Sequence, residues 1–219
     1  MKIIIEIDGI LTNLRPAYWQ AYQEAMKQIG LACADEGSFW RTIRRGDPIS
    51  TVLQGSKLHH ISAFESAFGT AQASPTFAEK LELHEDAREY VKKLKQLGTC
   101  HYVTLSAHAK TLSEMLTTVA LPGCDTTVTT LTDGQFSAQL KSLAGSDRPV
   151  ILLSAGERLL QAADAVGIIP IGIASGACIA KRMPRFGAIT TYRDVNAFCE
   201  ARAEGDPVLV RAGIQGDRR

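Results

Sequence analysis

The segment at residues 3–11 constrains the fold of this sequence more than any other. It reads Ile-Ile-Ile-Glu-Ile-Asp-Gly-Ile-Leu, as in a buried strand that ends in two acids followed by glycine. Alternate residues of a strand point to the same side, so Glu6 and Asp8 share one face at the C-terminal end of the strand. In open α/β sheets this is the edge at which ligands bind. The segment therefore predicts a buried strand that carries two carboxylates to a ligand site.

The rest of the sequence predicts an α/β fold with a helical insertion. From residue 86 onwards, helical apolar spacing alternates with short strand-like runs, which is typical of a parallel sheet covered by helices on both faces. Residues 13–82 carry helical spacing and little strand character, so we expect a helical cap over the C-terminal edge of the sheet. We expect residues 1–12 and 83–203 to form a Rossmann-like three-layer core. Residues 204–219 are rich in glycine and charge, which favours a flexible tail.

Composition excludes several classes of function. The sequence has 24 basic and 23 acidic residues and a net charge of +1, which gives no electrostatic case for binding nucleic acid or an anionic membrane. Its five cysteines lack metal-ligand spacing, as expected for reduced thiols in the cytoplasm. The first apolar run is broken at Glu6, too early for a signal peptide, and no segment approaches the roughly 18 apolar residues of a transmembrane helix. We therefore expect a soluble cytoplasmic protein.

The opening segment resembles the first motif of a known family. Residues 6–11, Glu-Ile-Asp-Gly-Ile-Leu, are similar to the motif Asp-x-Asp-Gly-Thr-Leu of the haloacid dehalogenase (HAD) superfamily. The segment from Leu81 to Gly98 looks like the one that leads into the second motif of phosphoglycolate-phosphatase-like members. The resemblance extends from Lys2 to about Phe198. It implies the HAD fold, a Rossmann-like α/β core with a cap inserted after the first strand.

Glu6 and Asp8 occupy the two acid positions of this first motif. In the family, the first acid is the covalent nucleophile, and the second protonates the leaving group and later activates water. The resemblance implies these two roles for Glu6 and Asp8. Glu6 is longer than Asp by one methylene, which displaces the attacking oxygen by about 1 Å and costs on the order of 10²-fold in rate. For Asp8 a second interpretation stays open, because an Asp-Gly pair also suits the turn after a strand.

The second and third motifs of the family supply ligands for the phosphate. The second motif contributes a hydroxyl, for which the resemblance suggests Thr104 as the better match and Ser106 as a second candidate. The third contributes a lysine that neutralises charge. Lys141 is the only lysine between residues 130 and 150, so we assign it to this role by elimination, with a surface lysine on a short helix as the alternative.

The fourth motif supplies the acids that hold Mg²⁺ in the family, and here those acids are missing. Matching the small-residue pattern at residues 162–167 places Ala155 and Leu159 at the two acid positions. Neither side chain can bind Mg²⁺, which takes oxygen ligands in octahedral geometry. A shift of two residues would bring Glu157 to an acid position, but it would break the later matches. We therefore expect no cofactor, and Mg²⁺ only if an active phosphatase persists; in that case Glu157 is the less favoured candidate for a metal ligand.

The altered motifs favour loss of catalysis over an active enzyme. We expect a HAD-like protein that has lost Mg²⁺-dependent phosphatase activity. Such a protein would bind a small anionic or phosphorylated ligand, or a protein partner through its cap. The expected anion ligands are Thr104, Ser106, Lys141 and the backbone amides of residues 8–11.

Three other hypotheses remain open at this point. The first is an active phosphomonoesterase with Glu6 as nucleophile and Asp8 as acid/base. A weaker one is a metal-independent dehalogenase, since such enzymes keep a serine at the position of Ser154 but need aspartates at the positions of Glu6 and Leu159. A purely structural subunit would show an exposed apolar patch on its cap.

Overall fold

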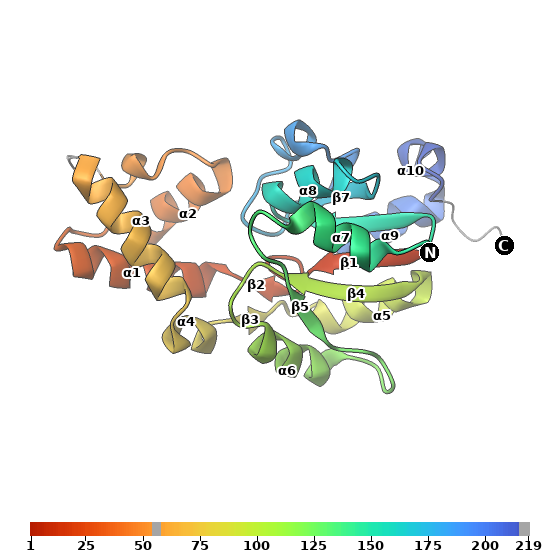
Figure 1. Ribbon diagram of the computed structural model, residues 1–219, viewed down its shortest axis with the longest axis horizontal. Coiled ribbons are helices and arrows are strands. Elements are labelled where there is room, and N and C mark those ends of the chain that lie inside the picture. Colours follow the sequence, from red (N-terminus) through yellow and green to blue (C-terminus); the bar gives the residue numbers. More distant parts are fainter. Residues whose placement is uncertain (54–57, 215–219) are drawn as a thin grey trace.

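The computed structural model describes residues 1–53 and 58–214 and contains a six-stranded sheet between two layers of helices (Figure 1). The strand order is β5-β4-β1-β6-β7-β8, and each pair of neighbours is parallel. The elements are β1 (Lys2–Glu6), β4 (Thr99–Thr104), β5 (Val128–Thr130), β6 (Val150–Ser154), β7 (Ile169–Ile173), the 3-10 helix η2 (Met183–Phe186) and β8 (Thr190–Tyr192). The predicted fold class, a parallel sheet covered by helices, is therefore confirmed.

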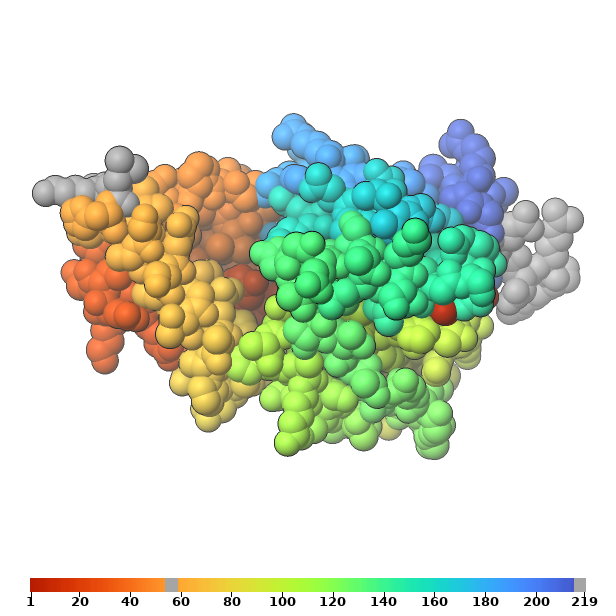
Figure 2. All heavy atoms as spheres, in the orientation of Figure 1, coloured from red at the N-terminus to blue at the C-terminus, as the bar shows by residue number. Residues whose placement is uncertain are grey.

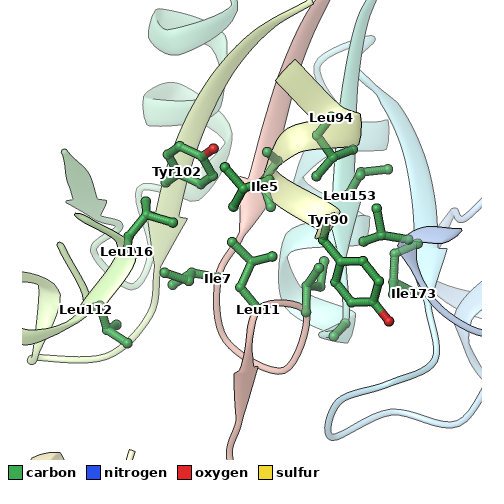
Figure 3. Packing of buried hydrophobic residues seen from close by; sticks show 14 of the residues in the cluster. Ile5, Ile7, Leu11, Tyr90, Leu94, Tyr102, Leu112, Leu116, Leu153 and Ile173 are labelled. Atoms are coloured by element: carbon green, nitrogen blue, oxygen red, sulfur yellow. The ribbon is translucent and has the colours of Figure 1, made fainter. Parts of the chain in front are cut away.

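The first strand lies inside the sheet because it is apolar on both faces. Ile3 and Ile5 belong to the same buried cluster as residues of three helices, which are α5 (Ala87–Leu97), α6 (Ala109–Val119) and α9 (Val195–Glu204). Ile4 belongs to the cluster on the other face, with α7 (Phe136–Ala144) and α8 (Glu157–Asp164). In Figure 3 the side chain of Ile5 lies among those of the first cluster. Each buried isoleucine contributes about 1.5–3 kcal/mol, so β1 holds both helical layers to the sheet.

A second group of helices lies beside the sheet, and we call residues 13–82 the cap (Figure 1). Its elements are α1 (Arg15–Ile29), α2 (Glu36–Arg45), the 3-10 helix η1 (Ile49–Thr51), α3 (Leu58–Gln72) and α4 (Pro75–Glu79). The cap has its own buried cluster, in which the rings of Tyr22 and Phe39 stack with centroids 4.3 Å apart. Across the described parts of cap and core, no helix has the length and apolarity needed to cross a membrane.

Several contacts attach the cap to the core, including a hydrogen bond between the ring of His108 and the carbonyl of Gln72. The short strand β2 (Thr12–Asn13) pairs antiparallel with β3 (Glu82–Leu83), so the chain enters and leaves the cap through one ribbon. Elsewhere, the guanidinium of Arg44 on α2 donates to the carbonyl of Ala174 at 2.9 Å. The amide of Ile179 donates to the carbonyl of Arg44 at 3.2 Å. Figure 2 shows the orange surface of the cap against the blue and green surface of the core.

The C-terminal segment differs from the flexible tail that we expected at residues 204–219. A short helix, α10 (Pro207–Arg211), begins after Asp206, whose carboxylate accepts hydrogen bonds from two backbone amides of its first turn. Leu209 and Ile214 are buried in the same cluster as β1. The N-cap and the burial of apolar side chains stabilise this helix. The glycine and charge content of the sequence did not indicate either feature. The remainder of the expected tail lies outside the described residues.

The loop after β1 approaches the loops after β6 and β7 closely. Gly9 has a φ of 79°, in the left-handed region that favours glycine. A Cβ atom on Gly176 would stand 2.6 Å from the Cβ of Ala155 and 3.0 Å from the Cα of Gly9. The hydroxyl of Ser175 donates to the carbonyl of Gly9 at 2.6 Å. The three loops therefore meet at a point that has no room for a further methyl group.

We predict that Gly176→Ala lowers the free energy of unfolding by about 1–3 kcal/mol, because the new methyl group overlaps Ala155. A control is Gly69→Ala on α3, where a Cβ meets nothing within 4 Å. This control should gain roughly 0.5–1 kcal/mol from the loss of a helix-interior glycine. Urea unfolding of both variants measures the difference. Similar stabilities would show that the three loops shift freely to make room.

Candidate functional site

The loops that follow β1, β4 and β6 meet at the carboxyl edge of the sheet and face the cap. Between them lies a cavity of about 430 Å³. The core contributes Glu6, Asp8 and Ser106 to its lining, and the cap contributes Tyr18 and Phe77. The strands place the two acids there because β1 lies between β4 and β6 in the sheet. The structure thus brings Glu6 and Asp8 into one site.

One oxygen of Glu6 is held by the loop after β6. The hydroxyl of Ser154 donates to Glu6 Oε2 at 2.5 Å, and the amides of Ala155 and Gly156 donate to the same atom at 2.9 and 3.0 Å. Glu6 is 3% exposed. The loop after β6 therefore holds one carboxylate oxygen of Glu6 in place.

Burial changes the charge state of Glu6. Removal from water and, to a smaller extent, the nearby charge of Asp8 raise the pKa of Glu6 to about 7. The three hydrogen bonds from residues 154–156 act in the opposite direction. Between pH 4.5, the ordinary pKa of glutamate, and about pH 7, Glu6 is therefore mostly neutral in the folded protein and mostly ionised in the unfolded chain.

Asp8 is held by the loop after β4, on the other side of β1. Its Oδ2 accepts hydrogen bonds from the hydroxyl of Thr104 at 2.6 Å and from the amide of Leu105 at 2.9 Å. Its Oδ1 is buried and has no hydrogen-bond partner among the described residues. Burial raises the pKa of Asp8, and the hydrogen bonds from Thr104, Leu105 and Ser106 oppose this shift. Asp8 therefore lines the cavity, while its Oδ1 is an acceptor buried away from solvent.

The two hydroxyl candidates occupy different environments. Thr104 is fully buried, and its hydroxyl is used by Asp8 and by the amide of Ser106, which donates to it at 2.9 Å. Ser106 lines the cavity, although its hydroxyl also accepts from the amide of His108 at 3.2 Å. The second candidate, Ser106, is thus the hydroxyl that faces the cavity, and Thr104 positions Asp8.

Three of the four backbone amides that we expected to bind an anion, those of residues 9–11, are engaged within the protein. The amide of Gly9 donates to the hydroxyl of Thr12 at 3.2 Å. The amides of Ile10 and Leu11 donate to the carbonyl of Ile7 at 3.3 and 3.1 Å. The amides of residues 9–11 are therefore engaged within this turn.

Lys141 lies away from the site. It is exposed in the last turn of α7, close to the carbonyls of Leu143 and Ala144, which accept hydrogen bonds from Lys2 at the start of β1. That is the amino edge of the sheet, opposite the cavity. Lys141 is therefore not among the residues that line the cavity, and its assignment as a phosphate ligand stays a prediction.

The basic residue that lines the cavity is Arg158, which the sequence analysis did not select. Its guanidinium lies 4.8 Å from the centroid of the Phe136 ring and pairs with the carboxylate of Asp133. Arg158 is half-exposed and lies in the first turn of α8, directly after the loop that follows β6. This position near the carboxyl edge of the sheet could have marked it in the sequence as a candidate site residue.

The fourth-motif segment brings no acid to the cavity. Ala155 lines the cavity, and Leu159 is buried against α7. The carboxylate of Glu157 instead pairs with Arg182 at 2.6 Å and accepts a hydrogen bond from the thiol of Cys178. Within residues 1–53 and 58–214, no three His, Cys, Asp or Glu side chains gather closely enough to hold a metal ion. Among the described residues, the acids that line the cavity are therefore Glu6 and Asp8, without a third carboxylate.

Aromatic side chains of the cap form one wall of the cavity. The rings of Tyr18 and Phe77 have centroids 5.9 Å apart. Burial, followed by the nearby carboxylates of Asp8 and Glu6, raises the pKa of Tyr18 to about 12, so its phenol remains neutral. The side chain of Gln72 acts in the opposite direction by hydrogen bonding. Helical spacing in the cap did not distinguish these wall residues from its buried core.

The exposed large apolar side chains lie outside the cap. Among the described residues they are Leu121, Ile189 and Val210, which belong to the core. The exposed apolar patch that a structural subunit would carry on its cap is therefore not observed in the described residues.

We predict that Glu6→Gln becomes more stable relative to the wild type as pH rises. A raised pKa stabilises the folded state fully below 4.5, and this contribution is lost as pH rises through about 7. Glutamine keeps the hydrogen bonds and never ionises. The stability difference should grow by about 3 kcal/mol from pH 4.5 to pH 8 in urea unfolding. Asp164→Asn, at an exposed acid on α8, serves as control; a pH-independent difference for Glu6→Gln would contradict the prediction.

Comparison with known proteins identifies the fold. No protein-family model and no curated protein sequence matches this chain. A HAD-like hydrolase from Streptococcus pneumoniae is similar in structure, with a TM-score of 0.69, 12% identity, and coverage of 91% of this chain and 96% of that one. A protein described as a predicted phosphatase from Clostridium acetobutylicum has a TM-score of 0.65, 13% identity and coverage of 93% and 98%. One described as a predicted phosphoglycolate phosphatase from Haemophilus somnus has a TM-score of 0.62, 18% identity and coverage of 90% and 96%. The chain therefore has the fold of the HAD-like hydrolases, which the opening motif implied.

Proposed function

We propose that this chain is a HAD-like protein without Mg²⁺-dependent phosphatase activity, and that it binds a small molecule in the cavity between cap and core. The observation that carries this proposal is the environment of Glu6 Oε2, which accepts three hydrogen bonds from residues 154–156. A covalent nucleophile attacks with a free lone pair and is weaker when protonated. Here the loop after β6 binds one of the two oxygens of Glu6, and burial raises the pKa of this acid to about 7, so that its neutral form persists well above the ordinary range of a carboxylic acid.

The chemistry of the loop after β6 supports the same conclusion. Phosphoryl transfer in this fold depends on a cation that neutralises the phosphoryl oxygens as the nucleophile approaches. The loop offers Ala155 and Leu159 where acids would be needed, and Glu157 is paired with Arg182. Without a bound cation, the two acids would repel an incoming phosphate.

Similarity of fold does not decide between a hydrolase and a binding protein. The structural neighbours described as hydrolases and phosphatases make phosphomonoester hydrolysis the reaction to test. A cavity of about 430 Å³ between two carboxyl groups and an aromatic wall supports a role that survives the loss of catalysis.

We predict that the protein hydrolyses p-nitrophenyl phosphate no faster than Asp8→Asn, with or without Mg²⁺. Release of p-nitrophenol is measured from pH 5 to pH 8, which spans both charge states of Glu6. Asp164→Asn serves as a matched control, since it removes a carboxylate outside the cavity.

The comparison with Asp8→Asn separates the protein's own activity from that of a contaminant. A contaminating phosphatase gives the same rate in every variant. Turnover that requires Mg²⁺, persists in Asp164→Asn and disappears in Asp8→Asn would refute the proposal and assign catalysis to this cavity.

A further inference from the structure

The loop between β7 and η2 holds the C-terminal end of α2 through three of its residues. The guanidinium of Arg44 donates to the carbonyl of Ala174 at 2.9 Å, and the amide of Ile179 donates to the carbonyl of Arg44 at 3.2 Å. A Cβ atom on Gly46, the C-cap of α2, would overlap the guanidinium of Arg182. Figure 1 shows α2 in orange beside the blue segment that follows β7. We call these three contacts between cap and core the clasp.

Arg182 also reaches the helix that follows the cavity loop after β6. Its guanidinium pairs with the carboxylate of Glu157 at 2.6 Å, and the two side chains are 21% and 27% exposed. Glu157 lies in the first turn of α8, next to Gly156 and Arg158, which both line the cavity. One guanidinium therefore contacts both the cap and the segment that forms one side of the cavity.

Two physical effects hold the guanidinium of Arg182 between these partners. The carbonyl end of a helix carries partial negative charge, which favours a cation beside the last turn of α2. The planar guanidinium packs over Gly46, where the missing side chain leaves room for it. Because α2 keeps water away from one side of Arg182, its attraction to Glu157 is stronger with the cap in place than with the cap moved away.

The carboxylate of Glu157 is turned toward the clasp in this arrangement. Besides the ion pair with Arg182, it accepts a hydrogen bond from the thiol of Cys178 in the same loop. The acids that line the cavity are Glu6 and Asp8. With the cap in place, the acid nearest to the loop after β6 is therefore kept out of the cavity lining.

We propose that Arg182 couples the cap to Glu157, so that movement of the cap away from the core and release of the Glu157 carboxylate are one event. When α2 leaves the loop, water reaches Arg182 and weakens its hold on Glu157, which is then free to change its rotamer. The charge beside the cavity thus depends on the position of the cap. This coupling does not depend on the proposed loss of phosphatase activity, and its test uses no substrate.

Hydrogen exchange of the Ile179 amide at pH 7 tests the coupling, because this amide donates to Arg44 of the cap. Glu157→Gln removes the charge of the ion pair and touches no residue of the cap. The Ile179 amide should exchange about 2–5-fold faster in this variant, as expected for loss of a partly exposed ion pair. The amide of Leu131, which donates to Thr104 within the core, should keep its rate and so exclude a loss of global stability.

Asp133→Asn is the matched control. It breaks the ion pair with Arg158 on the same helix turn and leaves Arg182 in place. The Ile179 amide should then exchange at the rate of the wild type. An equal acceleration in Asp133→Asn, or no acceleration in Glu157→Gln, would overturn the proposal.

A double variant tests whether Glu157 acts through Arg182. Arg182→Gln should speed exchange of the Ile179 amide, and adding Glu157→Gln to it should cause no further increase, because the partner of Glu157 is already gone. Two accelerations that multiply would show that Glu157 acts independently of Arg182, which contradicts the coupling.

A variant at another cap contact separates movement of the whole cap from loosening of the loop alone. The ring of His108 hydrogen bonds to the carbonyl of Gln72 at 3.0 Å and stacks with Phe77. This residue follows β4, which lies on the opposite side of β1 from β7. His108→Ala should speed exchange of the Ile179 amide about 2–10-fold, whereas Lys110→Ala, at an exposed position of the same helix, should not. An unchanged Ile179 rate in His108→Ala would show that the clasp opens without the cap and would overturn the proposal.

Discussion

Two buried carboxyl groups join the central strand to its neighbours, and the geometry of the site depends on them. Glu6 is held by the loop after β6, and Asp8 is held by the loop after β4. Both contacts lie where the main-chain pairing of β1 is ending. Because a buried carboxylate is costly unless donors surround it, each acid fixes the conformation of the loop that supplies those donors. The cavity lies between these two loops and the cap.

Most of the fold could be predicted because it follows from short-range patterns. A run that is apolar on both faces must lie inside a sheet, and the helical spacing after residue 86 supplies the layers on either side. The alternation of a strand was enough to bring Glu6 and Asp8 to the same edge. The similarity of the structure to HAD-like hydrolases agrees with the motif at residues 6–11.

The details of the site could not be predicted because they depend on contacts between distant parts of the chain. The hydroxyl partner of Glu6 lies 148 residues away, and no local pattern encodes that contact. Lys141 was chosen from its place in the sequence, although its helix ends at the opposite edge of the sheet. Thr104 and Ser106 are two residues apart, yet only the latter lines the cavity once the strand has ended. Tyr18 has the spacing of a core residue and also forms a wall.

The hydrogen bonds between Arg44 and the loop after β7 bear on how molecules enter and leave the cavity. A lid held by one ribbon swings freely, whereas Arg44 ties this one to the loop after β7 through Ala174 and Ile179. Movement of the cap away from the core would break these two hydrogen bonds together with the one between the His108 ring and the Gln72 carbonyl. A molecule that enters only when the cap moves would therefore bind at a rate limited by the opening of these contacts. The same tie slows departure, so residence time and cap rigidity rise together.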